Sequence, residues 1–90
     1  MRFAHKALRR LHDTDRSHGL PQHLVPRIRR ILGTLRVAAK PSDIDIPGYG
    51  LHPLKGDRAG YWSIRVSGNW RIVFRFRDGE PVDVNLIDYH

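Results

Sequence analysis

The sequence predicts an α+β domain in which two N-terminal helices pack on one face of a small, mainly antiparallel β-sheet. Two observations predict this class. Apolar residues recur at three- and four-residue steps in the first half of the chain, and they alternate with polar residues in the second half. The chain has 90 residues, which is enough for a single domain, 1–90, with one thin core.

Two amphipathic helices are expected in the first half. The first covers residues 4–13, and the second follows Pro21. Pro26 cannot donate a backbone hydrogen bond, so the second helix either kinks there or begins only near Pro26. It should end around residues 37–40, because Pro41 disfavours helix in the residue before it. Its apolar stripe consists of Leu24, Val25, Ile28, Ile31, Leu32 and Leu35.

Three strand-like runs follow a linker over residues 41–50, which is expected to pack on the surface through Ile44, Ile46 and Tyr49. Turns are expected at Ser67-Gly68 and at Asp78-Gly79, the second being a strong hairpin signal. The face that the helices should cover carries Trp62, Ile64, Val66, Trp70, Ile72, Phe74, Phe76, Val82, Val84 and Leu86. The opposite face should carry Ser63, Arg65, Arg71, Arg75 and Arg77.

The charge of the chain favours an acidic partner. The formal net charge is +7, and it is uneven: residues 1–40 hold ten Lys and Arg against two Asp, whereas residues 41–90 hold six against seven acids. RNA, DNA or an acidic protein surface would suit this charge. The alternative is that the basic residues only keep solvated helix faces soluble.

The composition excludes several classes of protein. There is no cysteine, so disulfides and thiolate chemistry are absent, and nothing points to an oxidising compartment. No apolar run approaches the roughly 20 residues of a membrane span, and the first residues lack the apolar segment of a signal peptide. We therefore expect no membrane association, and the cytoplasm is the simplest location.

A group of residues at the two ends of the predicted sheet holds the chemistry needed to cut RNA without a metal: His52, Lys55, Asp88, Tyr89 and His90. A histidine or Asp88 can take the proton of a 2′-hydroxyl, and the second imidazole can protonate the leaving oxygen. Lys55 and Arg71 can stabilise the phosphate charge. Tyr89 can stack on a base or hold the hydroxyl in line.

The same residues can also be interpreted without a catalytic role. His52 can be an ordinary loop histidine, and the last three residues can be a strand end with a frayed tail. A metal site built from His52, Asp88 and His90 is a further alternative. It lacks HxH or HExxH spacing, and we expect no metal or other cofactor.

Three stretches resemble the HigB family, the host-inhibition-of-growth toxins of the RelE/ParE superfamily. They are residues 51–66, Asn69-Trp70-Arg71-Ile72 and the terminal Asp88-Tyr89-His90. The resemblance implies the compact RelE-like fold and a ribosome-dependent endoribonuclease that cuts translated mRNA in the A site of the 70S ribosome. It also implies a HigA-like antitoxin with a helix-turn-helix domain, and contact with operator DNA only through the toxin–antitoxin complex.

The resemblance also implies site residues. His52, Asp88, Tyr89 and His90 match the family's catalytic positions, Lys55 and Arg71 its phosphate contacts, and Asn69 a position near the base being read. The predicted sheet face adds Arg65 and Arg75 as RNA contacts, because arginines on one face suit a phosphate backbone.

Two features depart from the family pattern: only Met1-Arg2 precede Phe3, so the first strand is stunted or its start is trimmed, and Pro26 lies in the second helix. Two rival functions are kept. One is a ParE-like gyrase poison, although ParE members lack this His/Asp/Tyr/His set. The other is a non-catalytic module whose basic sheet only binds nucleic acid or an acidic protein.

Overall fold

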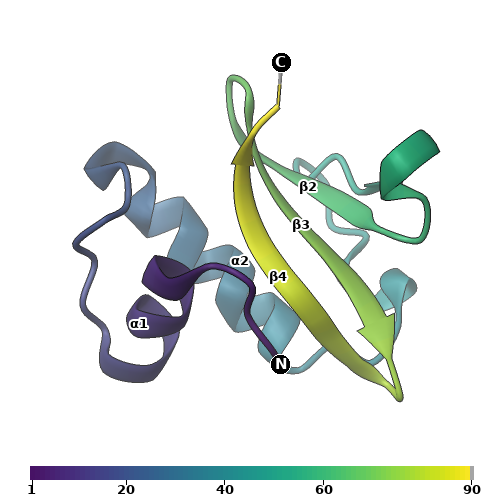
Figure 1. Ribbon diagram of the computed structural model, residues 1–90, viewed down its shortest axis with the longest axis horizontal. Coiled ribbons are helices and arrows are strands. Elements are labelled where there is room, and N and C mark those ends of the chain that lie inside the picture. The colour runs from purple at the N-terminus through teal and green to yellow at the C-terminus, as the bar shows by residue number, and fades with distance from the viewer. Residues whose placement is uncertain (90) are drawn as a thin grey trace.

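The computed structural model describes residues 1–89, which form two layers (Figure 1). The helical layer lies along one face of a four-stranded sheet whose spatial order is β1-β2-β3-β4, with every neighbouring pair antiparallel. The helices are α1 (Lys6–Thr14) and α2 (Val25–Arg36), and the strands are β1 (His52–Pro53), β2 (Trp62–Ser67), β3 (Trp70–Arg77) and β4 (Glu80–Asp88). This arrangement confirms the predicted fold class.

The second helix begins near Pro26, as one of the two expectations had it. A short 3₁₀ turn, η1 (Gln22–Leu24), precedes α2, and Pro26 is the second residue of the helix. The first turn of a helix has no intrahelical partners for its N–H groups, so the missing N–H of Pro26 costs nothing there. The helix ends at Arg36, one residue before the expected range.

The first helix begins at Lys6 rather than at residue 4, because His5 caps it. The Nδ1 atom of His5 accepts a hydrogen bond of 3.3 Å from the backbone N–H of Leu8. The cap replaces one of the partners that the first turn of a helix lacks. Burial lowers the pKa of His5 below its ordinary value, which favours the neutral ring that can accept this bond.

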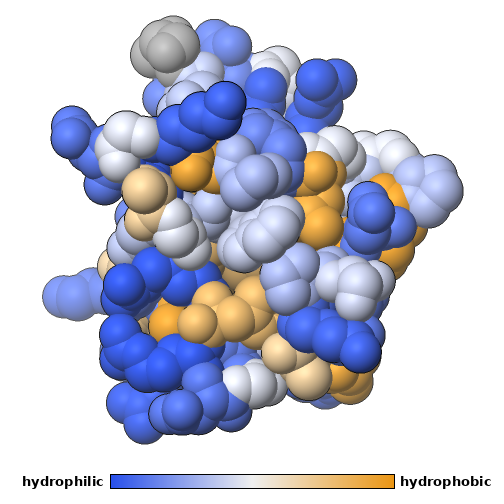
Figure 2. All heavy atoms as spheres, turned by 90° about the vertical axis from the view of Figure 1, so that its right-hand side faces the viewer, coloured by the Kyte–Doolittle hydropathy of each residue, from blue (hydrophilic) through white to orange (hydrophobic). Residues whose placement is uncertain are grey.

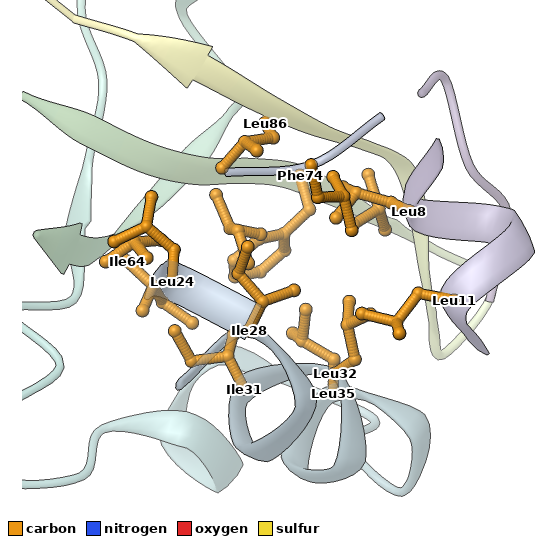
Figure 3. Packing of buried hydrophobic residues seen from close by; sticks show 14 of the residues in the cluster. Leu8, Leu11, Leu24, Ile28, Ile31, Leu32, Leu35, Ile64, Phe74 and Leu86 are labelled. Carbon is orange, nitrogen blue, oxygen red and sulfur yellow. The ribbon is translucent and has the colours of Figure 1, made fainter. Parts of the chain in front are cut away.

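The core lies between the helices and the sheet (Figure 3). Ile28 and Leu35 of α2 and Leu8 of α1 are fully buried, and they pack with Ile64 of β2 and Phe74 of β3. Each such side chain contributes on the order of 1.5–3 kcal/mol by leaving water. The helices therefore cover the face that the alternation of the strands marked as apolar.

The linker adds one more core residue. A 3₁₀ turn, η2 (Pro41–Ile44), buries Ile44 completely, and Tyr49 is half-buried against the core. Ile46 was expected to pack as well, but 37% of its surface is exposed. Two of the three expected linker contacts are thus present.

Two pieces of the sheet are shorter than a sequence pattern can reveal. In the two-residue strand β1, His52 pairs with Ser63 and Pro53 pairs with Trp62. A strand of two residues is too short to show an alternation in the sequence, so β1 was not predicted. At the opposite edge Phe3 forms an isolated parallel bridge with Val84, which agrees with a stunted first strand.

Both turns form close to their expected places. Asp78 and Gly79 have φ of 52° and 76°, which matches the twist that a two-residue hairpin needs. The turn between β2 and β3 is Gly68-Asn69, one residue later than expected, because Ser67 still pairs with Trp70.

A β-bulge at Asp83 corrects the prediction for Val82. Val73 pairs with Asn85 and Arg75 pairs with Val82, so two steps on β3 match three on β4. Asp83 has a φ of 53°, and the extra residue reverses the alternation of β4. Val82 is buried, but it lies opposite Arg75 on the face away from the helices, whereas Val84 packs in the core.

Within residues 1–89 no helix is both long and apolar enough to cross a membrane.

Candidate active site on the open face of the sheet

We call the face of the sheet away from the helices the open face. Strand register assigns to it His52, Ser63, Arg65, Arg71, Val73, Arg75, Val82, Asn85 and Ile87. Figure 2 shows the side of the molecule away from the helices. Hydrophilic residues lie at both its upper and its lower end, and hydrophobic patches show between them.

The open face is less polar than the sequence predicted. Ser63 was expected to be exposed, but only 1% of its surface is accessible, and its cross-strand neighbour Val73 is also buried. Leu54 and Val82 are further buried apolar residues outside the helix-packed core. The middle of the open face is therefore closed to solvent, and the arginines lie toward its two ends.

Arg65 and Arg71 are direct cross-strand partners on β2 and β3. Like charges placed opposite each other destabilise a sheet. Arg71 donates from Nη1 to the carbonyls of Gly68 at 2.6 Å and Trp70 at 3.0 Å. Neither guanidinium forms an ion pair with an acidic side chain of residues 1–89. This pair of positive charges is suited to an anionic ligand.

His52 lies one strand away from this arginine pair. Its Nδ1 atom is 3.0 Å from the carbonyl oxygen of Gly50, and the ring is exposed. A carbonyl can only accept, so Nδ1 carries the hydrogen and Nε2 is left for proton transfer. Gly50 has a φ of 58°, a left-handed conformation that favours glycine and aims its carbonyl at the ring.

The end of β4 joins the turn between β2 and β3. The N–H of Tyr89 donates to the carbonyl of Asn69 at 2.7 Å, which holds two predicted site residues together. Ile87 lies opposite Arg71, so the alternation of the strand directs Tyr89 toward the open face as well. Tyr89 is 45% exposed, so its ring is accessible to a ligand.

Asp88 is not on the same face as these residues. It is the cross-strand partner of Trp70, which packs against the helix-covered core, so the alternation assigns Asp88 to that side of the strand end. His90, the fourth predicted catalytic residue, lies outside the described residues. The structure thus brings His52, Arg71 and Tyr89 onto one face, with Asn69 in the turn at the end of that face and Asp88 on the other side of the strand end.

Lys55 lies at the outer edge of the site. It precedes a 3₁₀ turn, η3 (Gly56–Arg58), and is exposed. A backbone hydrogen bond of 2.8 Å from Leu54 to Tyr61 closes this loop back onto β2. Lys55 therefore lies two residues after β1, exposed at the edge of the sheet that carries His52.

Arg75 already has an anionic partner. Its Nε donates to Oδ2 of Asp83 at 2.8 Å, a second nitrogen contacts the same oxygen, and the guanidinium lies 5.3 Å above the ring of Tyr61. The hydrogen bond to Asp83 raises the pKa of Arg75 above its ordinary value. The prediction that Arg75 contacts RNA stays a prediction, but here its charge is balanced within the protein.

Sequence reasoning missed the residues that orient His52 and balance Arg75. Gly50 is recognisable only as one of several linker glycines, and no motif links Asp83 to Arg75, because the bulge that changes the register leaves no clear signal. Among residues 1–89 no three His, Asp or Glu side chains are grouped closely enough to hold a metal ion. The metal alternative included His90, so it stays untested.

Two helices on one face of a four-stranded antiparallel sheet form a RelE-like fold. A solved structure with this fold is "YoeB/ParE toxin from Agrobacterium tumefaciens", with a TM-score of 0.55 and 24% identity, covering 100% of this chain and 99% of that one. The likeness concerns the fold alone.

The chain belongs to the HigB-like toxin family. The family model described as "RelE-like toxin of type II toxin-antitoxin system HigB" matches residues 1–90. "Endoribonuclease HigB" of Proteus vulgaris is 43% identical over 88 residues, covering 98% of this chain and 96% of that protein. "Toxin HigB-1" of Vibrio cholerae is 32% identical over 88 residues, covering 96% and 93%. The family resemblance seen in the sequence is confirmed.

Proposed function

We propose that this protein is the toxin of a type II toxin–antitoxin system and acts as a ribosome-dependent endoribonuclease that cuts translated mRNA in the ribosomal A site. The observation that carries the proposal is the 43% identity, over nearly the whole chain, to a protein named endoribonuclease. The unbalanced Arg65–Arg71 pair beside His52 supports it, because a phosphodiester is the anion that such a nuclease must hold.

The proposed reaction is attack of the 2′-oxygen on the adjacent phosphorus, and it needs no metal. A base removes the 2′-hydroxyl proton, a P–O bond forms, and the bond to the 5′-oxygen breaks as an acid protonates that oxygen. His52, Asp88 and His90 share these proton transfers. Nε2 of His52 is suited to them, because Nδ1 is engaged by Gly50.

The remaining site residues stabilise charge and position the RNA. Arg71 and Lys55 neutralise the charge that builds on the phosphate oxygens in the transition state. Arg65 and Arg75 line the RNA backbone, Asn69 reads the neighbouring base, and Tyr89 stacks on a base or aligns the attacking hydroxyl. Asp88 acts from the edge of the site, since it lies on the other side of β4 from Tyr89.

The openness of this site supports the proposed dependence on the ribosome. His52, Lys55, Arg65 and Tyr89 are all exposed, so nothing in the described chain encloses an RNA strand. The two hollows that border α1, one lined by Leu11 and Leu32 and the other by Phe3 and Arg9, lie on the helical side. An RNA strand in such an open site needs a second surface to align its 2′-oxygen with the phosphorus, and in this proposal the ribosomal A site provides that surface.

The proposal includes the cell biology of such a system. A HigA-like antitoxin with a helix-turn-helix domain holds the toxin inactive, and operator DNA is contacted only through the complex. The site of action is the cytoplasm, where ribosomes translate. The net charge of +7 favours association with ribosomal RNA and with an acidic antitoxin surface.

The test is brief induction of the protein without antitoxin, followed by mapping of mRNA 5′ ends. Wild type is compared with the double variant His52→Ala/Asp88→Ala. The matched control is His12→Ala/Asp13→Ala, an exposed pair on α1 whose side chains are 3.0 Å apart. New ends within translated frames are expected for wild type and control, and not for the site variant.

Other outcomes point to the rival functions. Growth arrest with intact mRNA and DNA-damage signalling would favour a gyrase poison. Growth arrest that persists in His52→Ala/Asp88→Ala but disappears in Arg71→Glu would favour a non-catalytic binding module. Either result would remove the catalytic roles assigned above.

A further inference from the structure

Arg27 connects the helical layer to the edge of the sheet that carries His52. It belongs to α2 and is half-buried. Its Nη2 donates to the carbonyl oxygens of Gly48 and Arg65, both at 2.8 Å, and its Nε is 3.3 Å from the latter oxygen. The guanidinium also lies 5.4 Å from the centre of the Tyr49 ring. One side chain therefore holds the linker and β2 together.

These contacts complete an edge of β2 that would otherwise be unpaired. The neighbouring strand β1 pairs only with Trp62 and Ser63, so it stops short of Arg65. Beyond that point the N–H of Arg65 donates to the carbonyl of Tyr49 at 2.8 Å, and the carbonyl of Arg65 accepts from Arg27. Both backbone groups of Arg65 thus obtain partners, which an edge strand needs away from water.

The same linker segment orients His52. Residues 48–50 are attached to α2 at Gly48 and to β2 at Tyr49, and the carbonyl of the next residue, Gly50, accepts from Nδ1 of His52. A shift of this segment would move the Gly50 carbonyl and release the ring. The hydroxyl of Tyr49 lies 3.3 Å from Oγ1 of Thr34, a second link from α2 to this segment.

We infer that Arg27 is a positioning residue for the reaction: it holds residues 48–50 so that Gly50 keeps His52 in the tautomer with hydrogen on Nδ1, and it holds Arg65 beside Arg71. The inference rests on the proposed nuclease function. Arginine suits the role because its planar fork donates to two carbonyls while its face stacks on an aromatic ring, which a lysine ammonium cannot reproduce.

The experiment compares Arg27→Gln with Arg30→Gln, a charge-matched control on the same helix. Arg30 is exposed, and within residues 1–89 its guanidinium makes no hydrogen bond or ion pair. Two readouts are taken on each full-length protein. The first is cleavage of mRNA in a purified translation system. The second is the ¹⁵N NMR spectrum of the His52 ring, which shows which ring nitrogen carries the hydrogen; the His52 signals are assigned by their absence in His52→Gln.

Arg27→Gln is expected to lower cleavage by on the order of tenfold to a hundredfold, because small misplacements of reacting groups cost that much. The His52 spectrum should change from the Nδ1–H form to a mixture of tautomers. Arg30→Gln should leave both readouts at the wild-type level. Arg27→Lys, which keeps the positive charge but not the planar fork, should fall between Arg27→Gln and wild type, and it replaces Arg27→Gln if that protein does not fold.

Two outcomes would overturn the inference. One is an unchanged His52 spectrum in the Arg27 variants. The other is an equal loss of cleavage in Arg30→Gln, which would assign the effect to net charge. If the wild-type protein cleaves no RNA, the proposed function fails, while the spectrum still decides whether Arg27 orients His52.

Discussion

The two faces of the sheet differ in how their side chains are satisfied. On the covered face Ile64, Ile72 and Phe74 are fully buried against the helices, and this burial stabilises the fold. On the open face Arg65 and Arg71 lie opposite each other without an acidic partner among residues 1–89, which costs stability. The covered face thus holds the domain together, whereas the open face has two positive charges that are not balanced within residues 1–89.

The open face itself has two unlike ends. Near the β3–β4 hairpin Arg75 is paired with Asp83 and stacked on Tyr61, so its charge is balanced. Near the β2–β3 turn the Arg71 guanidinium hydrogen-bonds, within residues 1–89, only to backbone carbonyls. We therefore expect RNA phosphate to bind at the Arg71 end, which Tyr89 adjoins, with His52 at the level of Ser63 between the two ends.

The largest effect is expected from Arg71→Ala. Removing a cation that stabilises transition-state charge costs on the order of a hundredfold to a thousandfold in rate. The control is Arg77→Ala, an exposed arginine of the same strand at the balanced end, which removes the same charge. Cleavage is measured in a purified translation system. Equal losses in the two variants would show that only net charge matters and would break the contrast between the ends.

A smaller effect is expected at the covered face as the pH falls. The pKa of His5 in the folded protein is lowered below 6.5 by burial, so its stabilising contribution is fully present above that value and is lost as the pH falls through the folded-state pKa. Protonation removes the acceptor that caps α1, and the half-exposed cap contributes about 1 kcal/mol at most.

The measurement is urea unfolding of wild type and His5→Asn between about pH 7 and about pH 5. Asparagine can cap the helix without titrating in this range, so the wild type should lose stability relative to the variant. If the free energy of unfolding depends on pH in the same way for the two proteins, His5 does not stabilise α1, one of the helices that cover this face.

The smallest effect is expected from Asp83→Asn. The variant tolerates the left-handed backbone at position 83 but removes the carboxylate that balances Arg75, so the open face becomes positive at both ends. Binding of single-stranded RNA should tighten, and the slope of log affinity against log salt should steepen by about 0.7. Fluorescence anisotropy at several salt concentrations measures this slope.

The control for this measurement is Asp78→Asn. Asp78 is exposed in the hairpin turn, has a φ of 52°, and makes no ion pair within residues 1–89. The Asp78→Asn variant removes one negative charge from the β3–β4 hairpin end of the open face and leaves the ion pair of Arg75 intact. If Asp78→Asn steepens the slope equally, the Arg75–Asp83 pair does not explain the balance at this end.

Much of the candidate site could be predicted because its residues belong to motifs that can be recognised in the sequence. The block from Leu51 to Val66 and the ending Asp88-Tyr89-His90 indicated the family, and the alternation along β2 and β3 put Arg65 and Arg71 on one face. The same alternation misjudged Ser63 and Val82. A prediction from alternation requires a regular strand and a solvent-exposed outer face. The bulge in β4 breaks the first condition at Val82, and burial breaks the second at Ser63.

Periodicity, proline position and turn residues are local properties, so they were sufficient for the two helices, the three long strands and the charge of the open face. Contacts between distant segments have no such signature. Arg27 and Arg65 are 38 residues apart, and the two-residue strand β1 exists only because β2 is there to pair with it. Which arginine is balanced, and which carbonyl orients His52, therefore depend on how the folded segments meet in space.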